Sequence, residues 1–222
     1  MGRGIGILGG SFNPVHIGHL RLALEAVAAG MEHVELIPAG VPPHKRGRKL
    51  LPFAVRRRLV ELAVQDIPEL SVNPLEGQRN GPSYTVDTLR ILQKHRAPAA
   101  LYFILGCGDF LTLPQWHAWE ELLQCTNFLV AGRDGEGREA LRNFLHAECG
   151  AWSTEENTWA LPGAGRVVQY MEVPRLDVSS SMIREYMQHN RSIRFLVPDG
   201  VAQVLAEEAG QWEEASFGLS GD

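Results

Sequence analysis

The chain has 222 residues, 45% hydrophobic and 21% charged, and its 21 Lys and Arg against 26 Asp and Glu give a net charge of −5. These values are typical of a globular protein with a core of its own, and they exclude a largely disordered chain or a small fold stapled by disulfides or metals. The mild acidity argues against a nucleic-acid partner, and no apolar run approaches the roughly 18 residues of a membrane helix.

Three cysteines, Cys107, Cys125 and Cys149, are widely spaced and form no Cys-x-x-Cys pair. This pattern predicts neither a disulfide framework nor a cysteine-rich zinc site, and it favours a reducing compartment. We therefore expect a cytoplasmic protein with no membrane segment. The sequence does not define the oligomeric state, and a homo-oligomer is one form it allows.

Short apolar runs rich in β-formers alternate along the chain with segments of helical period. The expected strands are 4–9, 33–38, 70–75, 101–105, 127–131 and 167–173, and the expected helices are 17–29, 53–65, 84–94, 116–123, 139–147 and 181–188. Alternation of this kind predicts an α/β fold, a Rossmann-like doubly wound parallel sheet with helices on both faces. We expect a single domain over 1–222, with an irregular insertion at about 150–166 and a last helix at about 199–209.

In such a sheet, ligands bind beyond the carboxyl ends of the strands. One such place is the junction between the first expected strand and the first expected helix. Gly9–Gly10 allow a tight turn there, and Asn13 before Pro14 predicts a helix N-cap followed by a proline in the first turn. His16 and His19 then lie on one face of the first turns. Imidazolium groups are unfavourable at a helix N-terminus, whereas an anion is favourable, so the pair indicates a phosphate site.

A second glycine pattern lies just upstream. Residues 4–9 match the G-x-G-x-x-G string of dinucleotide-binding dehydrogenases. That motif requires its glycines at the turn itself, and here they fall within the expected strand. We therefore predict no dehydrogenase site.

Residues 11–19, Ser-Phe-Asn-Pro-Val-His-Ile-Gly-His, resemble the H-x-G-H signature of the nucleotidyltransferase superfamily, an element shared with class I aminoacyl-tRNA synthetases. Asn13 stands where the signature usually has Asp. The resemblance implies catalytic roles for His16 and His19. It also implies an ATP site that includes Gly9, Gly10, Ser11, Phe12, His16, Gly18 and His19.

A second candidate phosphate site follows the last expected strand. Residues 178–184 place consecutive serines before a helix, where hydroxyls and free N–H groups occur together. Arg184 lies in an early turn, where a cation is unfavourable unless an anion pairs with it. The segment resembles the superfamily's I-S-S-T-x-I-R element, which implies that Ser180, Ser181 and Arg184 hold the triphosphate of ATP, with Arg184 catalytic.

Four further segments resemble bacterial nicotinate-mononucleotide adenylyltransferases: 42–45, 82–89, 113–122 and 194–198. The resemblance implies an acceptor site made by Lys45, Tyr84, Thr85, Trp116 and His117. The helix start at Thr85 could bind the pyridine carboxylate, and the Trp116 ring could stack on the pyridinium. A core stripe of Trp116, Trp119 and Leu123 is the alternative from spacing alone, and the resemblance makes Trp119 the core residue.

Two details complete the expected site. The basic run from Lys45 to Arg58 is expected to be mostly a solvated face, with Lys45 assigned to a phosphate. The family usually has Asp two residues after the glycine equivalent to Gly106, but here that position is Gly108 and the carboxylate is Asp109. We assign Gly106 and Asp109 to the ATP site. Cys107 is expected to be a small filler.

The resemblance implies adenylyl transfer from ATP, accompanied by Mg²⁺, to nicotinate mononucleotide, with both substrates small molecules and no metal-ligating residues. Two alternatives stay open from the residues. The same chemistry could use nicotinamide mononucleotide or phosphopantetheine as acceptor, or the protein could be a non-catalytic nucleotide-binding sensor.

Overall fold

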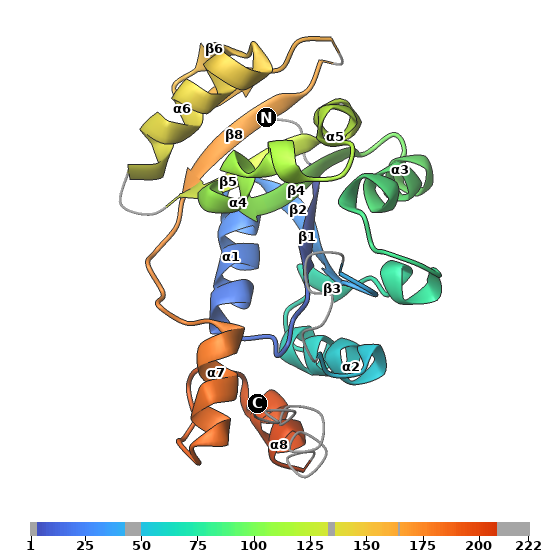
Figure 1. Cartoon of the computed structure of the whole chain (residues 1–222), viewed down its shortest axis with the longest axis vertical. Coiled ribbons are helices and arrows are strands. Elements are labelled where there is room, and N and C mark those ends of the chain that lie inside the picture. The colour runs from blue at the N-terminus through green and yellow to red at the C-terminus, as the bar shows by residue number, and fades with distance from the viewer. Residues whose placement is uncertain (1–3, 43–49, 133–135, 164, 208–222) are drawn as a thin grey trace, which may run out of the picture. The chain divides into compact units, whose positions relative to one another are not determined.

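A computed structural model describes residues 4–42, 50–132, 136–163 and 165–207 (Figure 1). The chain divides into two compact units. The first comprises 1–9, 22–35 and 84–176, and the second comprises 10–21, 36–83 and 177–222.

The described strands form a sheet in the order β3-β2-β1-β4-β5-β8-β7-β6. Their bounds are Gly4–Gly10 (β1), Met31–Pro38 (β2), Leu70–Val72 (β3), Ala100–Gly106 (β4), Asn127–Gly132 (β5), Trp152–Glu155 (β6), Thr158–Ala160 (β7) and Val167–Glu172 (β8). The predicted α/β class with a largely parallel sheet is confirmed. The third strand is shorter than expected, because the chain turns into a 3-10 helix, η2 (Leu75–Gln78).

The helices alternate with the strands as predicted. They are Ile17–Ala28 (α1), Phe53–Val64 (α2), Thr85–Arg96 (α3), Cys107–Leu111 (α4), Trp119–Cys125 (α5), Glu136–Cys149 (α6), Ser180–Gln188 (α7) and Asp199–Glu207 (α8), with a second 3-10 helix, η3 (Leu113–Gln115). Gly30, with φ of 105°, follows the end of α1. Positions 208 and 209 of the expected last helix lie outside the described residues.

In the first unit, β1, β4, β5 and β8 run parallel, as the repeated strand–helix pattern predicts. Gly4 and Gly6 lie inside β1, and a Cβ atom at Gly4 would come within 2.7 Å of the Tyr102 ring. These glycines therefore serve strand packing, and the prediction that they form no dinucleotide turn is confirmed. Phe110 and Phe128 are fully buried and meet edge to face with ring centroids 5.4 Å apart.

The segment 150–166 is not irregular, contrary to expectation. It contains β6 and β7, which pair antiparallel, and β7 pairs antiparallel with β8. The four residues of β6 are all exposed, so no alternation of apolar and polar residues marks the strand. Trp159 of β7 is buried and anchors the pair to the unit.

The expected helix at 116–123 begins later, at Trp119. Ala118 has a left-handed backbone with φ of 50°, and Trp116 is extended at the end of η3. Trp116 therefore does not share a helix with Trp119 and Leu123, and the predicted stripe is broken by the backbone. No composition signal marks Ala118, since alanine is ordinarily a good helix former.

In the second unit, α2 packs against α8 (Figure 1). The buried face of α2 carries Leu59, Val60, Ala63 and Val64, and α8 contributes Val201, Val204 and Leu205. Within the described part of the chain, no helix combines the length and apolarity needed to cross a membrane.

The close packing of Tyr170 on Gly132 gives the first prediction. A Cβ atom at Gly132 would overlap the Tyr170 ring, so we expect Gly132→Ala to lower the free energy of unfolding by about 1–3 kcal/mol. Gly108→Ala is the matched control, because nothing lies within 4 Å of the added atom and the position is helical. Urea unfolding of both variants measures the difference. Equal stability of the two would contradict the described packing.

Candidate active site

The loop from Gly10 to His16 joins β1 to α1, and α1 begins at Ile17. The prediction that Asn13 caps this helix is therefore wrong. Its Oδ1 atom instead accepts a hydrogen bond from the Leu51 N–H at 2.9 Å. A tertiary partner far along the chain competes for the side chain, and local spacing cannot show that partner.

His16 and His19 form the start of α1 together. The His16 carbonyl accepts the His19 N–H at 2.9 Å, and Nδ1 of His19 accepts the His16 N–H at 3.2 Å. This is the return bond of a capping box made by an imidazole. With Nδ1 as acceptor, a neutral His19 ring carries its proton on Nε2, which makes Nε2 a hydrogen-bond donor. The two rings stack with centroids 3.7 Å apart.

Gly18 is required by close packing around His16. A Cβ atom at this position would lie 3.1 Å from two atoms of the His16 ring and 3.0 Å from Cγ1 of Val178. Phe12 is fully buried with a left-handed φ of 44°, and its ring meets His19 edge to face at 4.9 Å. The spacing of the H-x-G-H element thus follows from the contacts of two imidazole rings.

His16 is buried, with 7% of its surface exposed. Its Nδ1 atom is buried with no hydrogen-bond partner among the described residues. Burial lowers the pKa of His16 from 6.5 to about 4, so the ring is neutral at pH 7. A neutral ring with an unsatisfied nitrogen can bind an incoming polar group.

The predicted residues of α7 lie against the same loop. Ser179 is the N-cap, accepting the Met182 N–H at 3.1 Å. Ser180 Oγ donates to the Pro14 carbonyl at 2.8 Å. Arg184 donates from Nη1 to the Asn13 carbonyl at 2.7 Å and from Nη2 to Ser181 Oγ at 3.0 Å. Because these bonds hold α7 to the loop before α1, the structure brings His16, His19, Ser180, Ser181 and Arg184 into one group, the phosphate cluster.

The C-terminal element 194–198 meets the same helix start. The Ile17 N–H at the start of α1 donates to the Leu196 carbonyl at 3.0 Å. One of the first N–H groups of α1, which has no partner within the helix, is thereby satisfied by the protein itself.

Four of the predicted acceptor residues, Tyr84, Thr85, Trp116 and His117, lie in the first unit. Tyr84 precedes Thr85, the first residue of α3, and its ring lies 4.1 Å from the His117 ring. Trp116 is half-buried and approaches Phe103 edge-on at 6.3 Å. Trp119 is only half-buried and is not among the buried core residues, so its expected place in the core is wrong.

Asp109 lies on the helical turn α4, directly after β4. Its Oδ2 atom is 3.8 Å from the point where a Cβ atom of Gly106 would lie, and the residue is exposed. Cys107 on the same turn is buried, and its Sγ donates to the Gly137 carbonyl at 3.2 Å. Burial raises the pKa of the Cys107 thiol, which suits the expected filler and not a nucleophile.

The basic run from Lys45 to Arg58 is described only in part. Lys45 lies outside the described residues. Arg56, expected on a solvated face, is 2% exposed and donates to backbone carbonyls. Composition could not single it out, because Arg56–Arg58 are three consecutive arginines and α2 buries only the first.

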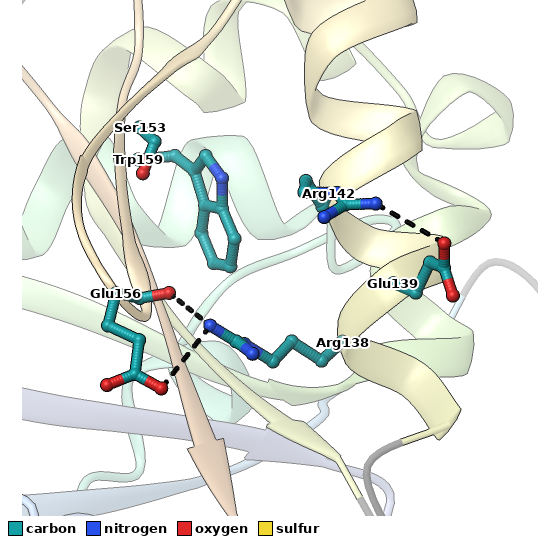
Figure 2. A pocket seen from close by; sticks show the side chains of 6 residues that line it. All are labelled: Arg138, Glu139, Arg142, Ser153, Glu156 and Trp159. Atoms are coloured by element: carbon teal, nitrogen blue, oxygen red, sulfur yellow. Dashed lines mark hydrogen bonds and ion pairs between the residues drawn. The ribbon is translucent and has the colours of Figure 1, made fainter.

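A cavity of about 600 Å³ lies between α6 and the β6–β7 pair (Figure 2). Its charges are mutually paired: Arg142 lies 3.3 Å from the Glu139 carboxylate, and Arg138 lies 3.7 Å from the Glu156 carboxylate. None of the predicted site residues lines it. Across the described residues, no three His, Cys, Asp or Glu side chains gather as a metal site would require.

Comparison with known proteins defines the class. The family model described as cytidylyltransferase-like matches residues 7–186, so the chain belongs to these nucleotidyltransferases. A protein of Pseudomonas putida strain W619 named "Probable nicotinate-nucleotide adenylyltransferase" is 42% identical over 212 residues, covering 93% of this chain and 94% of its own. A namesake from Geobacter metallireducens is 39% identical over 207 residues, covering 91% and 95%. Within its class, the chain is a member of the nicotinate-nucleotide adenylyltransferase family.

The fold comparison agrees. The Plasmodium falciparum nicotinic acid mononucleotide adenylyltransferase complexed with NaAD aligns with a TM-score of 0.71 and 16% identity, covering 99% of this chain and 100% of that one. The same enzyme complexed with APC aligns with a TM-score of 0.69, covering 93% and 96%. At this identity the likeness establishes the shared fold.

The buried His16 predicts a pH-dependent stability. The unfolded chain binds a proton near pH 6.5, whereas the folded His16 resists protonation down to about pH 4. Its contribution is therefore fully present above pH 6.5 and is lost as the pH falls toward 4, by an amount on the order of 3 kcal/mol. We expect wild type to lose this much stability relative to His16→Asn in urea unfolding between pH 7 and pH 4. Parallel pH profiles would show that His16 is not buried as described.

Proposed function

We propose that this protein transfers the adenylyl group of MgATP to nicotinate mononucleotide, giving nicotinate adenine dinucleotide and pyrophosphate, a step of NAD biosynthesis in the cytoplasm. The phosphate cluster carries the proposal. It places the N-termini of α1 and α7 on one loop, together with two imidazoles and one guanidinium. Helix N-termini and cationic donors favour polyphosphate binding.

The ATP phosphates are assigned to the second unit. We assign His16, His19 and Arg184 to catalysis, with Nε2 of His19 as donor to the α-phosphate. Arg184 and the start of α7 at Ser180 and Ser181 would hold the β- and γ-phosphates. The remaining proposed ATP contacts are Gly9, Gly10, Ser11, Phe12, Gly18, Gly106 and Asp109.

The proposed reaction requires neither a general base nor a covalent enzyme intermediate. An oxygen of the acceptor phosphate forms a bond to the α-phosphorus of ATP, and the bond from that phosphorus to the bridging oxygen of the leaving pyrophosphate breaks. A phosphate monoester with a second pKa near 6 is already largely dianionic at pH 7, so no proton has to be removed. Catalysis then consists of alignment and of neutralising charge on the leaving group.

We take Mg²⁺ as part of the MgATP substrate. The phosphate cluster supplies imidazole, hydroxyl and guanidinium groups, which suit phosphate oxygens, whereas Mg²⁺ prefers carboxylate, phosphate and water oxygens. Asp109 is the carboxylate among the proposed ATP contacts. When bound with ATP, the ion would neutralise charge on the phosphates.

The acceptor is assigned to Lys45, Tyr84, Thr85, Trp116 and His117. The first N–H groups of α3 have no carbonyl partner within the helix, and Thr85 supplies the first of them. A pyridine carboxylate is a suitable anion for that helix start. The half-buried Trp116 ring, fixed at one edge by Phe103, could stack on the pyridinium, with Lys45 on the acceptor phosphate.

Pyrophosphate release tests the function directly. Wild type would be supplied with MgATP and, in parallel, nicotinate mononucleotide, nicotinamide mononucleotide or phosphopantetheine. We expect fastest release with nicotinate mononucleotide, and a loss of about 100-fold or more in His19→Ala, since a donor to the transition state is removed. Preference for another acceptor would refute the assigned acceptor residues. No release with any acceptor, together with retained ATP binding, would indicate a nucleotide sensor.

Trp116 gives a sharper test of the acceptor site. Trp116→Ala is expected to raise the KM for nicotinate mononucleotide about tenfold, because stacking and cation–π contacts contribute roughly 1–2 kcal/mol. Trp116→Phe keeps an aromatic face and should recover most of this loss. The KM for ATP should stay within about twofold in both variants, and a rise in the KM for ATP alone would overturn the assignment.

A further inference from the structure

We propose that Arg56, which lies outside the recognised motifs, is the positioning residue of the phosphate cluster, an inference that rests on the proposed function. Arg56 lies on α2 and is 2% exposed, the largest of the fully buried side chains. Its neighbour Arg57 is exposed and pairs with Glu61 at 2.9 Å. The helix therefore buries one arginine and leaves the next in solvent.

The Arg56 guanidinium donates to carbonyls of three separate segments. Nε donates to Leu51 at 2.9 Å, and Nη1 donates to Ser11 at 2.9 Å and to Ala39 at 2.7 Å. Nη2 donates to Gly40 at 3.3 Å. One rigid fork thus holds the loop after β1, the loop after β2 and the residue near the start of α2.

The loop after β2 is also held by a second buried side chain, that of Glu76. Glu76 is buried in η2, and its Oε2 accepts the Gly40 N–H at 3.3 Å. Gly40 is therefore held by Glu76 at its N–H and by Arg56 at its carbonyl. A side chain at Gly40 would overlap the Glu76 carbonyl, so the loop has one packed arrangement.

A continuous set of hydrogen bonds leads from Arg56 to Arg184. Leu51, whose carbonyl accepts Arg56 Nε, donates its N–H to Asn13 Oδ1 at 2.9 Å. The Asn13 carbonyl accepts Nη1 of Arg184 at 2.7 Å. Arg56 also holds Ser11, two residues before Asn13. A displacement of this loop would move the carbonyl that orients the catalytic guanidinium.

Stability alone gives a poor account of this buried guanidinium. Its hydrogen bonds go to neutral carbonyls, and burial lowers the pKa of Arg56 by more than the nearby Glu76 carboxylate raises it. Desolvating a cation costs several kcal/mol, and well-packed apolar replacements of buried charges are often neutral or stabilising. What an apolar side chain cannot do is fix four carbonyls of three segments in one geometry. Such geometry matters for transfer between two bound anions, where a shift of about 1 Å can cost roughly 100-fold in rate.

The test compares Arg56→Lys with Arg57→Lys on the same helix. Lysine keeps the charge at position 56 and loses the planar fork. At a temperature where urea unfolding shows both variants fully folded, we expect kcat for Arg56→Lys to fall about 10- to 100-fold. The KM for nicotinate mononucleotide should stay within about twofold, and Arg57→Lys should match wild type. Wild-type kcat per folded molecule in Arg56→Lys would overturn the proposal.

A double-mutant cycle tests the route through Arg184. If Arg56 acts by orienting Arg184, then adding Arg56→Lys to the Arg184→Lys variant should lower kcat by only about a further twofold. The guanidinium that Arg56 orients is already absent from that variant. Multiplying effects would show that the two residues act independently and would refute the route. Should Arg56→Lys fail to fold, Asn13→Ala removes the Leu51 bond without changing a charge, and it should show the same non-additivity with Arg184→Lys.

The closing measurement separates this inference from the proposed function. Calorimetric titration of MgATP alone needs no acceptor. We expect Arg56→Lys to weaken MgATP binding by about threefold or more relative to Arg57→Lys. If wild type releases no pyrophosphate yet this difference is found, the proposed reaction fails and the positioning role stands. If wild type is active and neither kcat nor MgATP binding differs between the two variants, the positioning role fails alone.

Discussion

The loop between β1 and α1 is held by its backbone carbonyls, and the phosphate cluster depends on that constraint. Gly10 accepts the Ala39 N–H, and Ser11 accepts Arg56. Asn13 accepts Arg184, and Pro14 accepts Ser180. Because the carbonyls are occupied by protein donors, the loop is fixed before any ligand binds. Preorganised donors are what an anionic transition state requires, since little reorganisation is left for the reaction itself.

The same loop places two imidazoles at a helix N-terminus. Cations are unfavourable there, and burial resolves the conflict by keeping His16 neutral, with a pKa of about 4. His19 avoids it by accepting the His16 N–H through Nδ1, as a carboxylate would in a capping box. Under the proposed function, a bound polyphosphate would favour the protonated ring, because nearby negative charge raises the pKa of a histidine. The buried His16 thus adds no positive charge to this helix start at pH 7.

Six of the described strands, the glycine turn and the serine-capped helix could be predicted from the sequence, because local periodicity or local hydrogen bonding indicates each of them. It did not locate the partners of Asn13 or the burial of Arg56, because both depend on contacts between segments distant in the chain. The misjudged helix at 116–123 has a different cause. Ala118 has a left-handed backbone just before the helix begins. Glycine and asparagine are the residues that usually indicate this conformation in a sequence, and alanine is not. The β6–β7 pair was missed because an exposed strand has no apolar face.

Asp109 illustrates why position in space matters more than position in sequence. Counted along the chain, this carboxylate is displaced by one residue from the place that the family pattern usually gives it. In a strand, such a shift would move the side chain to the opposite face. Here the chain becomes helical directly after Gly106, and a residue three positions along a helix returns to the same face. Oδ2 of Asp109 accordingly lies 3.8 Å from the Cβ position of Gly106. The helical turn of α4 thus places the Asp109 carboxylate at the carboxyl end of β4.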